Sequence, residues 1–381
     1  MQKRIWLSLA HMGGKEQDFI QEAFDTNWVV PLGPNVDGFE ADLEKYLQTK
    51  PKTIAALSAG TAAIHLGLLL AGVEKGDEVI CQSFTFSASC NPIVYLGATP
   101  VFVDSEKESW NMDPALLREA IEDRIKKTGK RPKAIVPVHL YGMPAKMDEI
   151  MAIANQYEIP VVEDAAEGLG STYKGKPCGT WGRFGVLSFN GNKMITTSGG
   201  GALICPDQET CQKAIFYATQ ARDPYPYYHH THIGYNYRLS NICAGIGRGQ
   251  MLVLDEHIAR RRQIQKIYQK AIDPIPGCHI MDNPSTDSNS NFWLSCIVID
   301  KEQSGFSAED LRLFLDSRNI ESRRLWYPMH RQPVFAQAPA YLNGISDACF
   351  EAGLCLPSGS SLTDEEIENV ISCIQHIASR K

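Results

Sequence analysis

Short apolar runs alternate with longer stretches of mixed apolar and polar positions along the first half of the chain. These runs are rich in β-branched residues, which is typical of strands that are buried on both faces. They lie at 53–58, 78–82, 99–104, 133–140 and 160–165. Helical segments between such strands indicate βαβ units, so the pattern predicts an α/β fold with a mostly parallel sheet.

Two further apolar runs, at 185–189 and 200–205, follow each other too closely for a crossover helix between them. A parallel connection would need that helix, so we expect an antiparallel, hairpin-like return.

The rest of the chain predicts a second, smaller α/β unit. From Ser240 to about Ile272 the sequence predicts one long helix that bridges the two units, with the basic cluster Arg260, Arg261 and Arg262 on a solvated face. Beyond it we expect a polar loop, a strand, a helix and a capped final helix, at 283–291, 292–300, 307–317 and from about 361. The expected division is a large domain over 1–250 and a small C-terminal domain over 251–381.

Composition narrows the class of protein. A chain of 381 residues with 44% hydrophobic content can bury a large core, and its net charge of −7 gives no broad attraction for nucleic acid. Eleven cysteines are scattered without CxxC pairs, which favours a reducing compartment. The N-terminal apolar run is too short for a signal peptide, and polar residues interrupt the most apolar window, 54–73. We therefore expect a cytoplasmic protein with no nucleic-acid or membrane partner.

A lysine candidate for covalent chemistry lies in the segment SFNGNKM. Lys193 comes just after a predicted strand end, where loops of α/β sheets commonly form sites, and its amine could form an imine with an aldehyde cofactor. Ser188 could donate its hydroxyl to a phosphate, and the glycines in 196–201 let the backbone pass close to a ligand. A solvated turn is the alternative interpretation of this segment.

A carboxylate candidate ends the apolar run at 160–165. A buried Asp164 could form a salt bridge with a protonated pyridine nitrogen. A divalent-metal site from Glu163 and Asp164 is an alternative, as are acidic caps at a strand end. Adjacent strand residues point to opposite faces, which makes a shared metal ion the poorer choice.

Two more segments could contact a flat, phosphorylated cofactor. At Gly60 and Thr61 a strand turns into a helix, whose exposed amides can bind phosphate, although such turns are also common without a ligand. In the segment 83–88 one of two rings, Phe84 or Phe86, could cover a flat cofactor, and from the order within the motif we select Phe86 as the stacking residue. Core packing is the ordinary explanation for both rings.

An aromatic and histidine-rich loop precedes the predicted long helix and could reach a neighbouring subunit. A metal cluster of His229, His230 and His232 lacks a companion acid or cysteine, so polar and aromatic contacts are the better interpretation.

In order and spacing, these pieces resemble the DegT/DnrJ/EryC1/StrS family of sugar aminotransferases, which are fold-type I pyridoxal phosphate (PLP) enzymes. The resemblance spans nearly the whole chain, through SAGTAA, SFTFSASCNPI, EDAAEGLG, SFNGNK, GYNYRLS and LWYPMH. It implies a large domain with a mostly parallel mixed sheet and a smaller C-terminal α/β domain. It also implies L-glutamate as amino donor, pyridoxamine phosphate as the intermediate form of the cofactor, and a nucleotide-linked keto sugar as acceptor.

The resemblance assigns roles to the candidate residues. Lys193 matches the Schiff-base lysine, Asp164 the partner of the pyridine nitrogen, and Phe86 the residue that stacks on the ring. Asn236 matches an asparagine that reaches the phosphate across a homodimer interface. The phosphate contacts that it implies within the same subunit are Gly60, Thr61 and Ser188.

The sequence departs from the family pattern at two places. Many members have Gln or His where this chain has Glu167, which we still expect near the cofactor, and many have a Glu within the run at 198–200. The combination of EDAAEG with SFNGNK is most similar to the branch that aminates C4 of UDP-4-keto-6-deoxy-N-acetylglucosamine. Dehydratase siblings have histidine in place of the lysine, so Lys193 argues against that subclass.

The pyrophosphate of such an acceptor needs cations or amides near the pocket. Arg238 and His330 are the selected candidates, with Arg323 and Arg324 as further possibilities and a solvated surface as the alternative for each. Amination at C3, or of another nucleotide sugar, stays open. A PLP lyase or desulfurase would need a reactive loop cysteine, a ligand sensor an output module, and a Rossmann dehydrogenase a GxGxxG motif, and the sequence singles out none of these.

Overall fold

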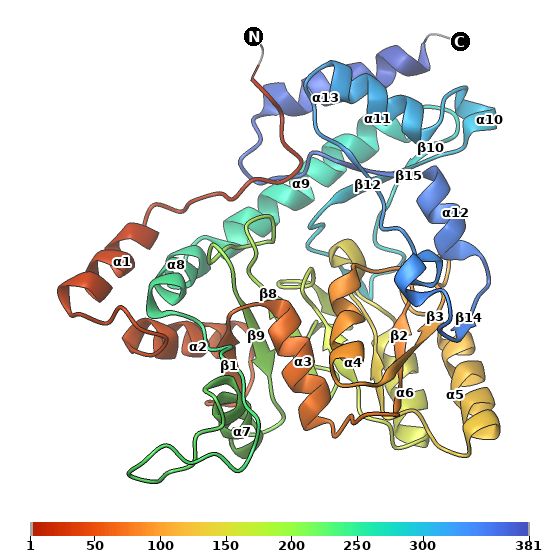
Figure 1. Ribbon diagram of the computed structural model, residues 1–381. Helices are drawn as coiled ribbons and strands as arrows, with labels where there is room; N and C mark the ends of the chain where they lie inside the picture. The colour runs from red at the N-terminus through yellow and green to blue at the C-terminus, as the bar shows by residue number, and fades with distance from the viewer. Residues whose placement is uncertain (1–2, 380–381) are drawn as a thin grey trace.

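The computed structural model describes residues 3–379, and its larger part is built around one twisted sheet (Figure 1). The strands of this sheet are, in spatial order, β1 (Ile54–Leu57), β9 (Gly201–Ile204), β8 (Phe184–Ser188), β5 (Val162–Asp164), β4 (Ala134–Val136), β2 (Glu78–Gln82), β3 (Thr99–Val103) and β14 (Ala340–Tyr341). Parallel bridges from Ile135 to Val161 and from Val138 to Asp164 join its two halves. β9 runs antiparallel to both of its neighbours, and the other paired strands are parallel. The mostly parallel sheet and the close return from β8 to β9 are thereby confirmed.

The strand predicted at 133–140 is too long. The structure ends β4 at Val136, and Pro137, which has no N–H to donate, follows it. Tyr141 then adopts a left-handed backbone conformation with φ of 54° in a short 3-10 turn, Leu140–Gly142. The apolar residues of this segment are buried because they line the interior next to the sheet, and not because they continue the strand.

Helices cover the sheet and border the site. They are α1 (Glu16–Asp25), α2 (Pro34–Leu47), α3 (Gly60–Leu70), α4 (Asn91–Tyr95), α5 (Pro114–Thr128), α6 (Met147–Gln156), α7 (Gln208–Ala218) and α8 (Asn241–Met251). α3 begins at Gly60, as predicted, directly after the extended residue Ala59. It packs against β8 and β9, and Gly67 lets it lie close to Val162 and Leu203.

The single long helix predicted from Ser240 to Ile272 is wrong. The structure has two helices, α8 and α9 (Leu254–Ile272), separated by Leu252 and Val253. Val253 leaves helical geometry with φ of −118° and ψ of 7°, and its side chain packs against Gly13. The hydrophobic pattern continues through this break, and neither residue between the two helices is a proline or a glycine. The sequence therefore does not predict the change of direction. α9 still connects the two parts of the molecule (Figure 1).

The expectation that the basic cluster on α9 forms a solvated face is wrong for Arg261, which is 1% exposed. Its guanidinium donates to the carbonyl oxygens of Trp293 and Ser358 and to Ser8 Oγ. These acceptors come from three distant segments, so Arg261 ties the N-terminal segment to the smaller part of the molecule. A charged side chain is tolerated there because its hydrogen bonds compensate for burial.

Replacing Arg261 by alanine should lower the free energy of unfolding by about 3 kcal/mol, because several buried acceptors lose a charged donor. Arg260 provides the control, since it pairs with Asp364, whose side chain is 73% exposed. We expect Arg260→Ala to cost about 1 kcal/mol or less. Equilibrium urea denaturation of both variants measures this difference, and equal losses would contradict the anchoring role of Arg261.

The smaller part combines a sheet with helices, as expected for a small α/β unit, and all pairs of strands in this sheet are antiparallel. Its strands, in spatial order, are β10 (Cys278–Ile280), β12 (Ser295–Ile299), β15 (Gly353–Leu356) and β13 (Arg323–Arg324). Its further helices are α10 (Lys301–Ser304), α11 (Ala308–Ser317), α12 (Ile345–Ala352) and α13 (Asp364–Ala378). The expected cap of the final helix is present as a capping box between Thr363 and Glu366. An isolated β-bridge joins Ile5, near the N-terminus, to Ile320 in this part. The division of the chain into two domains at residue 250 stays a prediction.

Two minor features complete the fold. A small sheet is formed by β11 (Ser288–Asn289), β6 (Thr172–Tyr173) and β7 (Lys176–Pro177). Within residues 3–379, no helix combines the length and the apolar character that crossing a bilayer requires.

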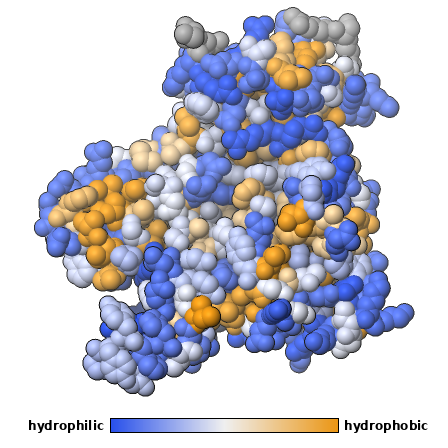
Figure 2. Space-filling model, in the orientation of Figure 1, coloured by the Kyte–Doolittle hydropathy of each residue, from blue (hydrophilic) through white to orange (hydrophobic). Residues whose placement is uncertain are grey.

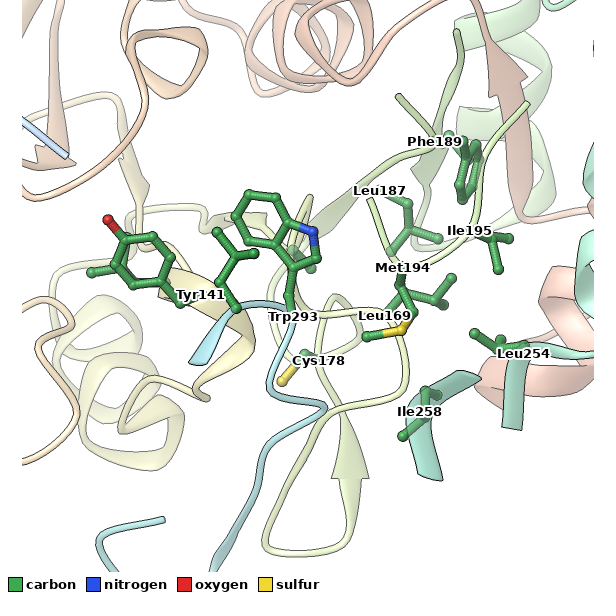
Figure 3. Close-up of a cluster of buried hydrophobic side chains, with 14 of the residues drawn as sticks. Tyr141, Leu169, Cys178, Leu187, Phe189, Met194, Ile195, Leu254, Ile258 and Trp293 are labelled. Atoms are coloured by element: carbon green, nitrogen blue, oxygen red, sulfur yellow. The ribbon is translucent and has the colours of Figure 1, made fainter. Parts of the chain in front are cut away.

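A hydrophobic cluster lies beneath the loops that carry the candidate residues (Figure 3). Met194, directly after Lys193, is 5% exposed, and Leu169, two residues after Glu167, is 3% exposed. Tyr141 and Trp293 stack in the same cluster, with ring centroids 6.3 Å apart. Burial of these neighbours fixes the backbone on which the polar side chains of the site are mounted.

Candidate active site

A cavity of about 590 Å³ opens at the carboxyl ends of β5 and β8 and the start of α3. In open α/β sheets this edge is the usual position of a ligand site. The sequence-predicted residues that line the cavity are Gly60, Thr61, Phe86, Asp164, Glu167, Ser188 and Lys193. These residues come from several segments of the chain, so the fold brings together what the sequence analysis could only select one by one.

Lys193 lies inside the cavity, and its side chain is only 12% exposed. Its Nζ is 3.2 Å from Glu167 Oε1 and 4.1 Å from the centroid of the Trp293 ring. A turn in which Lys193 N–H donates to Asn190 O holds its backbone. The amine is therefore positioned by a carboxylate and an aromatic face, which argues against a solvated turn.

Glu167 is a buried carboxylate held at both oxygens. Oε1 accepts from Lys193 Nζ, and Oε2 accepts from the backbone N–H of Tyr141 at 2.7 Å. Burial raises the pKa of Glu167 above its usual value, and the nearby charge of Asp164 adds to this effect. Lys193 and the Tyr141 N–H oppose the rise but do not cancel it.

Asp164 ends β5 with its carboxylate toward the cavity, and the residue is 5% exposed. Oδ2 accepts from Ser89 Oγ at 2.6 Å, and Oδ1 accepts from the Ala166 N–H at 3.1 Å. The Ser89 hydroxyl is in turn 2.7 Å from Thr85 Oγ1. Ser89 is a contact that the sequence analysis missed, although it directly follows the segment 83–88 that was considered for Phe86.

Glu163 points to the other side of β5, as the alternation of strand side chains predicts. Its Oε2 is 3.0 Å from His139 Nε2 and accepts from the Gly179 N–H. Glu163 and Asp164 therefore do not share a site. Across residues 3–379, no group of three or more His, Cys, Asp or Glu side chains is arranged to hold a metal ion.

The start of α3 forms one wall of the cavity and offers backbone amides. A Cβ on Gly60 would lie 3.0 Å from Ser188 Cβ, so only glycine lets this turn approach β8 so closely. The Thr61 and Ser188 side chains and the backbone of Gly199 and Gly200 border the same space. Helix N-terminal amides with nearby hydroxyls are a typical phosphate-binding arrangement.

The cavity has an aromatic rim. Phe84 is fully buried whereas Phe86 is 50% exposed and lines the cavity, so the selected ring is the one that is free to stack on a ligand. The ring centroid of Trp326 lies 5.1 Å from that of Phe86, and the Trp326 ring also stacks with that of Tyr141. Neither Trp326 nor Trp293 was selected from sequence, since a tryptophan gives no local sign of whether it packs in a core or faces a ligand.

Three predicted residues do not line the cavity of their own chain. Asn236 is exposed and bridges to Thr219 at the start of the aromatic loop. Arg238 is occupied by an ion pair with Glu40 and by Ala56 O. The predicted substrate contact of Arg238 is thus unsupported within one chain and stays a prediction.

His330 is also held away from the cavity. Its Nδ1 lies 2.7 Å from Ser83 Oγ, and its Nε2 lies 3.4 Å from Asp347. Of the basic pair that forms β13, Arg323 does line the cavity, whereas Arg324 donates to the carbonyl of Phe350. In the histidine-rich loop, His229 contacts Asp223 and the Tyr225 ring, which fits the polar and aromatic interpretation.

These residues fit PLP. An aldehyde needs an amine, a phosphate needs amides and hydroxyls, and a protonated pyridine nitrogen needs a carboxylate. The cavity offers Lys193, the start of α3 with Ser188, and Asp164. The close approach of Gly60 to Ser188, which brings the first amides of α3 and the Ser188 hydroxyl to one wall of the cavity, supports this fit directly.

Comparison with known proteins agrees with the fold and the cavity. Residues 11–375 match the DegT/DnrJ/EryC1/StrS aminotransferase family. The chain is 48% identical over 381 residues to a Bacillus subtilis protein named "Putative pyridoxal phosphate-dependent aminotransferase EpsN", covering 99% of this chain and 96% of that one. It is 36% identical to GDP-perosamine synthase of Escherichia coli O157:H7, with 97% of each chain covered. Among solved structures, the aminotransferase TlmJ from Streptoalloteichus hindustanus superposes with a TM-score of 0.90 at 26% identity, with 99% of each chain covered.

The fold and the site thus define an α/β transferase of fold type I, as expected from the sequence. The chain belongs to the DegT/DnrJ/EryC1/StrS aminotransferase family. It is an aminotransferase, and the resemblance noted from its motifs is confirmed over almost its whole length.

Proposed function

We propose that this PLP-dependent enzyme transfers an amino group from L-glutamate to a keto group of a nucleotide-linked deoxy sugar. The proposed acceptor position is C4 of UDP-4-keto-6-deoxy-N-acetylglucosamine, for the synthesis of a surface polysaccharide or glycan in the cytoplasm. The observation that carries the proposal is the amine of Lys193 held inside a cavity that also presents Asp164 and the N-terminus of α3. Relatives named GDP-perosamine synthase support a sugar nucleotide as the acceptor.

In this proposal, different walls of the cavity bind different parts of the cofactor. Lys193 Nζ would bond to the aldehyde carbon, and Asp164 would hold the proton of the pyridine nitrogen. Phe86 would cover one ring face, while Gly60, Thr61 and Ser188 would bind the phosphate. When bound, the cofactor supplies an electron sink for the pair left behind as a proton leaves the donor's Cα.

Lys193 would also move the proton that the transfer requires. Once released, Nζ would take the proton from the donor's Cα and would give it up to a carbon of the bound cofactor. With the sugar bound, the same amine runs this transfer in reverse. Glu167 and the Trp293 ring limit the positions of Nζ, so one lysine can serve both directions.

We propose that two copies of the chain share each active site, with Asn236 of one copy reaching the phosphate in the other. The exposed position of Asn236 is compatible with this role. An exposed apolar surface supports pairing: it lies on and after α1, is visible as an apolar area in Figure 2, and includes Phe24, Trp28, Val29, Val30 and Leu32. Tyr228, in the aromatic loop before α8, is a further exposed ring, at 80%.

A GDP-linked keto sugar is the second candidate acceptor, favoured by three relatives named GDP-perosamine synthase, at 36%, 35% and 32% identity. The experiment incubates holoenzyme and L-glutamate with UDP- or GDP-linked 4-keto-6-deoxy sugars and follows 2-oxoglutarate and amino sugar by mass spectrometry. We expect the UDP-linked acceptor to be preferred by at least about tenfold in kcat/KM, since buried polar contacts discriminate strongly between bases. A preference for the GDP sugar would move the assignment to the second candidate, and NMR of the product would distinguish C4 from C3.

A further inference from the structure

Lys193 faces a carboxylate, and this carboxylate has very little freedom to move. The side chain of Glu167 is 5% exposed, and its Oε1 lies 3.2 Å from Lys193 Nζ. The Tyr141 N–H holds Oε2, while Asn291 Nδ2 donates to the backbone carbonyl of Glu167 at 2.8 Å. One oxygen is therefore fixed by the protein frame, and the other is directed at the reactive nitrogen.

The groups around Glu167 leave it as the proton acceptor for Lys193. Asp164, on β5, adds negative charge that favours a proton on Glu167, and burial raises the pKa of Glu167 in the same direction. Burial also raises the pKa of the Tyr141 hydroxyl and of the Cys296 thiol well above their usual values, so neither is an anion at neutral pH.

The remaining polar neighbours do not compete for that proton. Cys355, on β15, lies with its Sγ 3.9 Å from Cys296 Sγ. Arg323, on the cavity wall, is paired with Glu321 at 2.7 Å. The carboxylate directed at Lys193 is thus the one that belongs to Glu167.

We propose that Glu167 accepts the proton that the Lys193 ammonium must lose before Nζ can bond to the cofactor. This inference rests on the proposed function, because it needs Lys193 to be the residue that binds the aldehyde carbon. An N–H bond of the ammonium breaks and leaves its electron pair on Nζ, while the proton joins Glu167 Oε1. The pair on Nζ then forms the C–N bond. The two hydrogens that remain on Nζ pass to the aldehyde oxygen, which leaves as water while the C=N bond forms.

The test measures how fast the apoprotein takes up PLP at different pH values, by stopped-flow absorbance, in the wild type and in Glu167→Gln. Glutamine can hold the amine in a hydrogen bond but cannot accept its proton. We expect uptake by the variant to be about 100-fold slower near neutral pH, the size of effect typical of a lost general base. The deficit should shrink as pH rises, because hydroxide then removes the proton.

Glu78→Gln is the matched control, since Glu78 pairs with Arg124 at 2.6 Å at the start of β2 and does not line the cavity. It should retain the wild-type rate at every pH. A Glu167→Gln rate that equals the wild type, or that is lowered by the same factor at all pH values, would overturn the proton-acceptor role. The second pattern is what a purely structural role would produce.

Two additions keep the test decisive. Glu167→Asp retains an acid–base group, so its uptake should keep the wild-type dependence on pH at a lower rate, and it replaces the glutamine variant if that variant does not fold. Borohydride reduction of the wild type, followed by peptide mass mapping, shows separately whether the cofactor attaches to Lys193. Absence of that mass would defeat the proposed function itself, whereas attachment with an unaltered Glu167→Gln profile would defeat only this inference.

Discussion

Replacing Lys193 by alanine should reduce amino transfer by on the order of 10⁴-fold, because one substitution removes both the covalent attachment and the proton carrier. Lys193 is the one lysine among the described residues that line the cavity. A water molecule could take the proton but could not be held where Glu167 and the Trp293 ring hold Nζ. Single-turnover kinetics with L-glutamate, followed by absorbance and by release of 2-oxoglutarate, measure the loss.

The Lys193→Ala protein should still bind PLP without covalent attachment, since the phosphate and ring contacts stay. Methylamine added to this variant should restore part of the activity, because a free amine can enter the space that the side chain leaves. Lys176→Ala is the control. Lys176, on β7, lies over the ring of Trp181 and does not line the cavity, so its loss should leave the rate of amino transfer unaltered. Covalent cofactor recovered from Lys193→Ala after borohydride reduction would show that another lysine carries the chemistry.

The sequence was sufficient to predict the parts of the fold that depend on local patterns. Buried strands such as β2 and β3 appear as apolar runs, and α3 begins where Gly60 follows such a run. The break between α8 and α9 was missed because packing of Val253 on Gly13 joins segments far apart in the chain. Burial of Arg261 was missed for the same reason, since its acceptors belong to segments that only the folded chain brings together.

The same distinction applies to the site. Lys193 and Asp164 lie at or just after strand ends, where the local sequence pattern is enough to select a candidate residue. The structure places both in one cavity. The aromatic residues around them could not be selected in this way, because the backbone of Tyr141 and the stacking of Trp326 depend on tertiary contacts. The 3.2 Å approach of Glu167 to Lys193 likewise has no sequence signature beyond the departure from the family pattern at that position.

Asp164→Asn should lower the rate of amino transfer by about 10²- to 10³-fold while PLP still attaches to Lys193. Asparagine has nearly the same shape and can still accept from the Ala166 N–H, so the geometry at the end of β5 should persist. The amide has no negative charge, however, and cannot stabilise a proton on the pyridine nitrogen where charge develops as the Cα proton leaves. Stopped-flow rates with L-glutamate would show the loss, and equilibrium dialysis would show how much cofactor affinity remains.

Ser89→Ala separates the charge of Asp164 from its positioning. Ser89 Oγ donates to Asp164 Oδ2 at 2.6 Å, so the alanine variant keeps the carboxylate but frees it to rotate. One lost hydrogen bond to a charged group corresponds to about 1.5–3 kcal/mol, which sets an upper bound of roughly 10- to 100-fold on its effect. The asparagine variant should therefore be the slower of the two. If Ser89→Ala were the more impaired variant, the orientation of Asp164 rather than its charge would limit the reaction. If Asp164→Asn kept the wild-type rate of amino transfer, Asp164 would not have its assigned role.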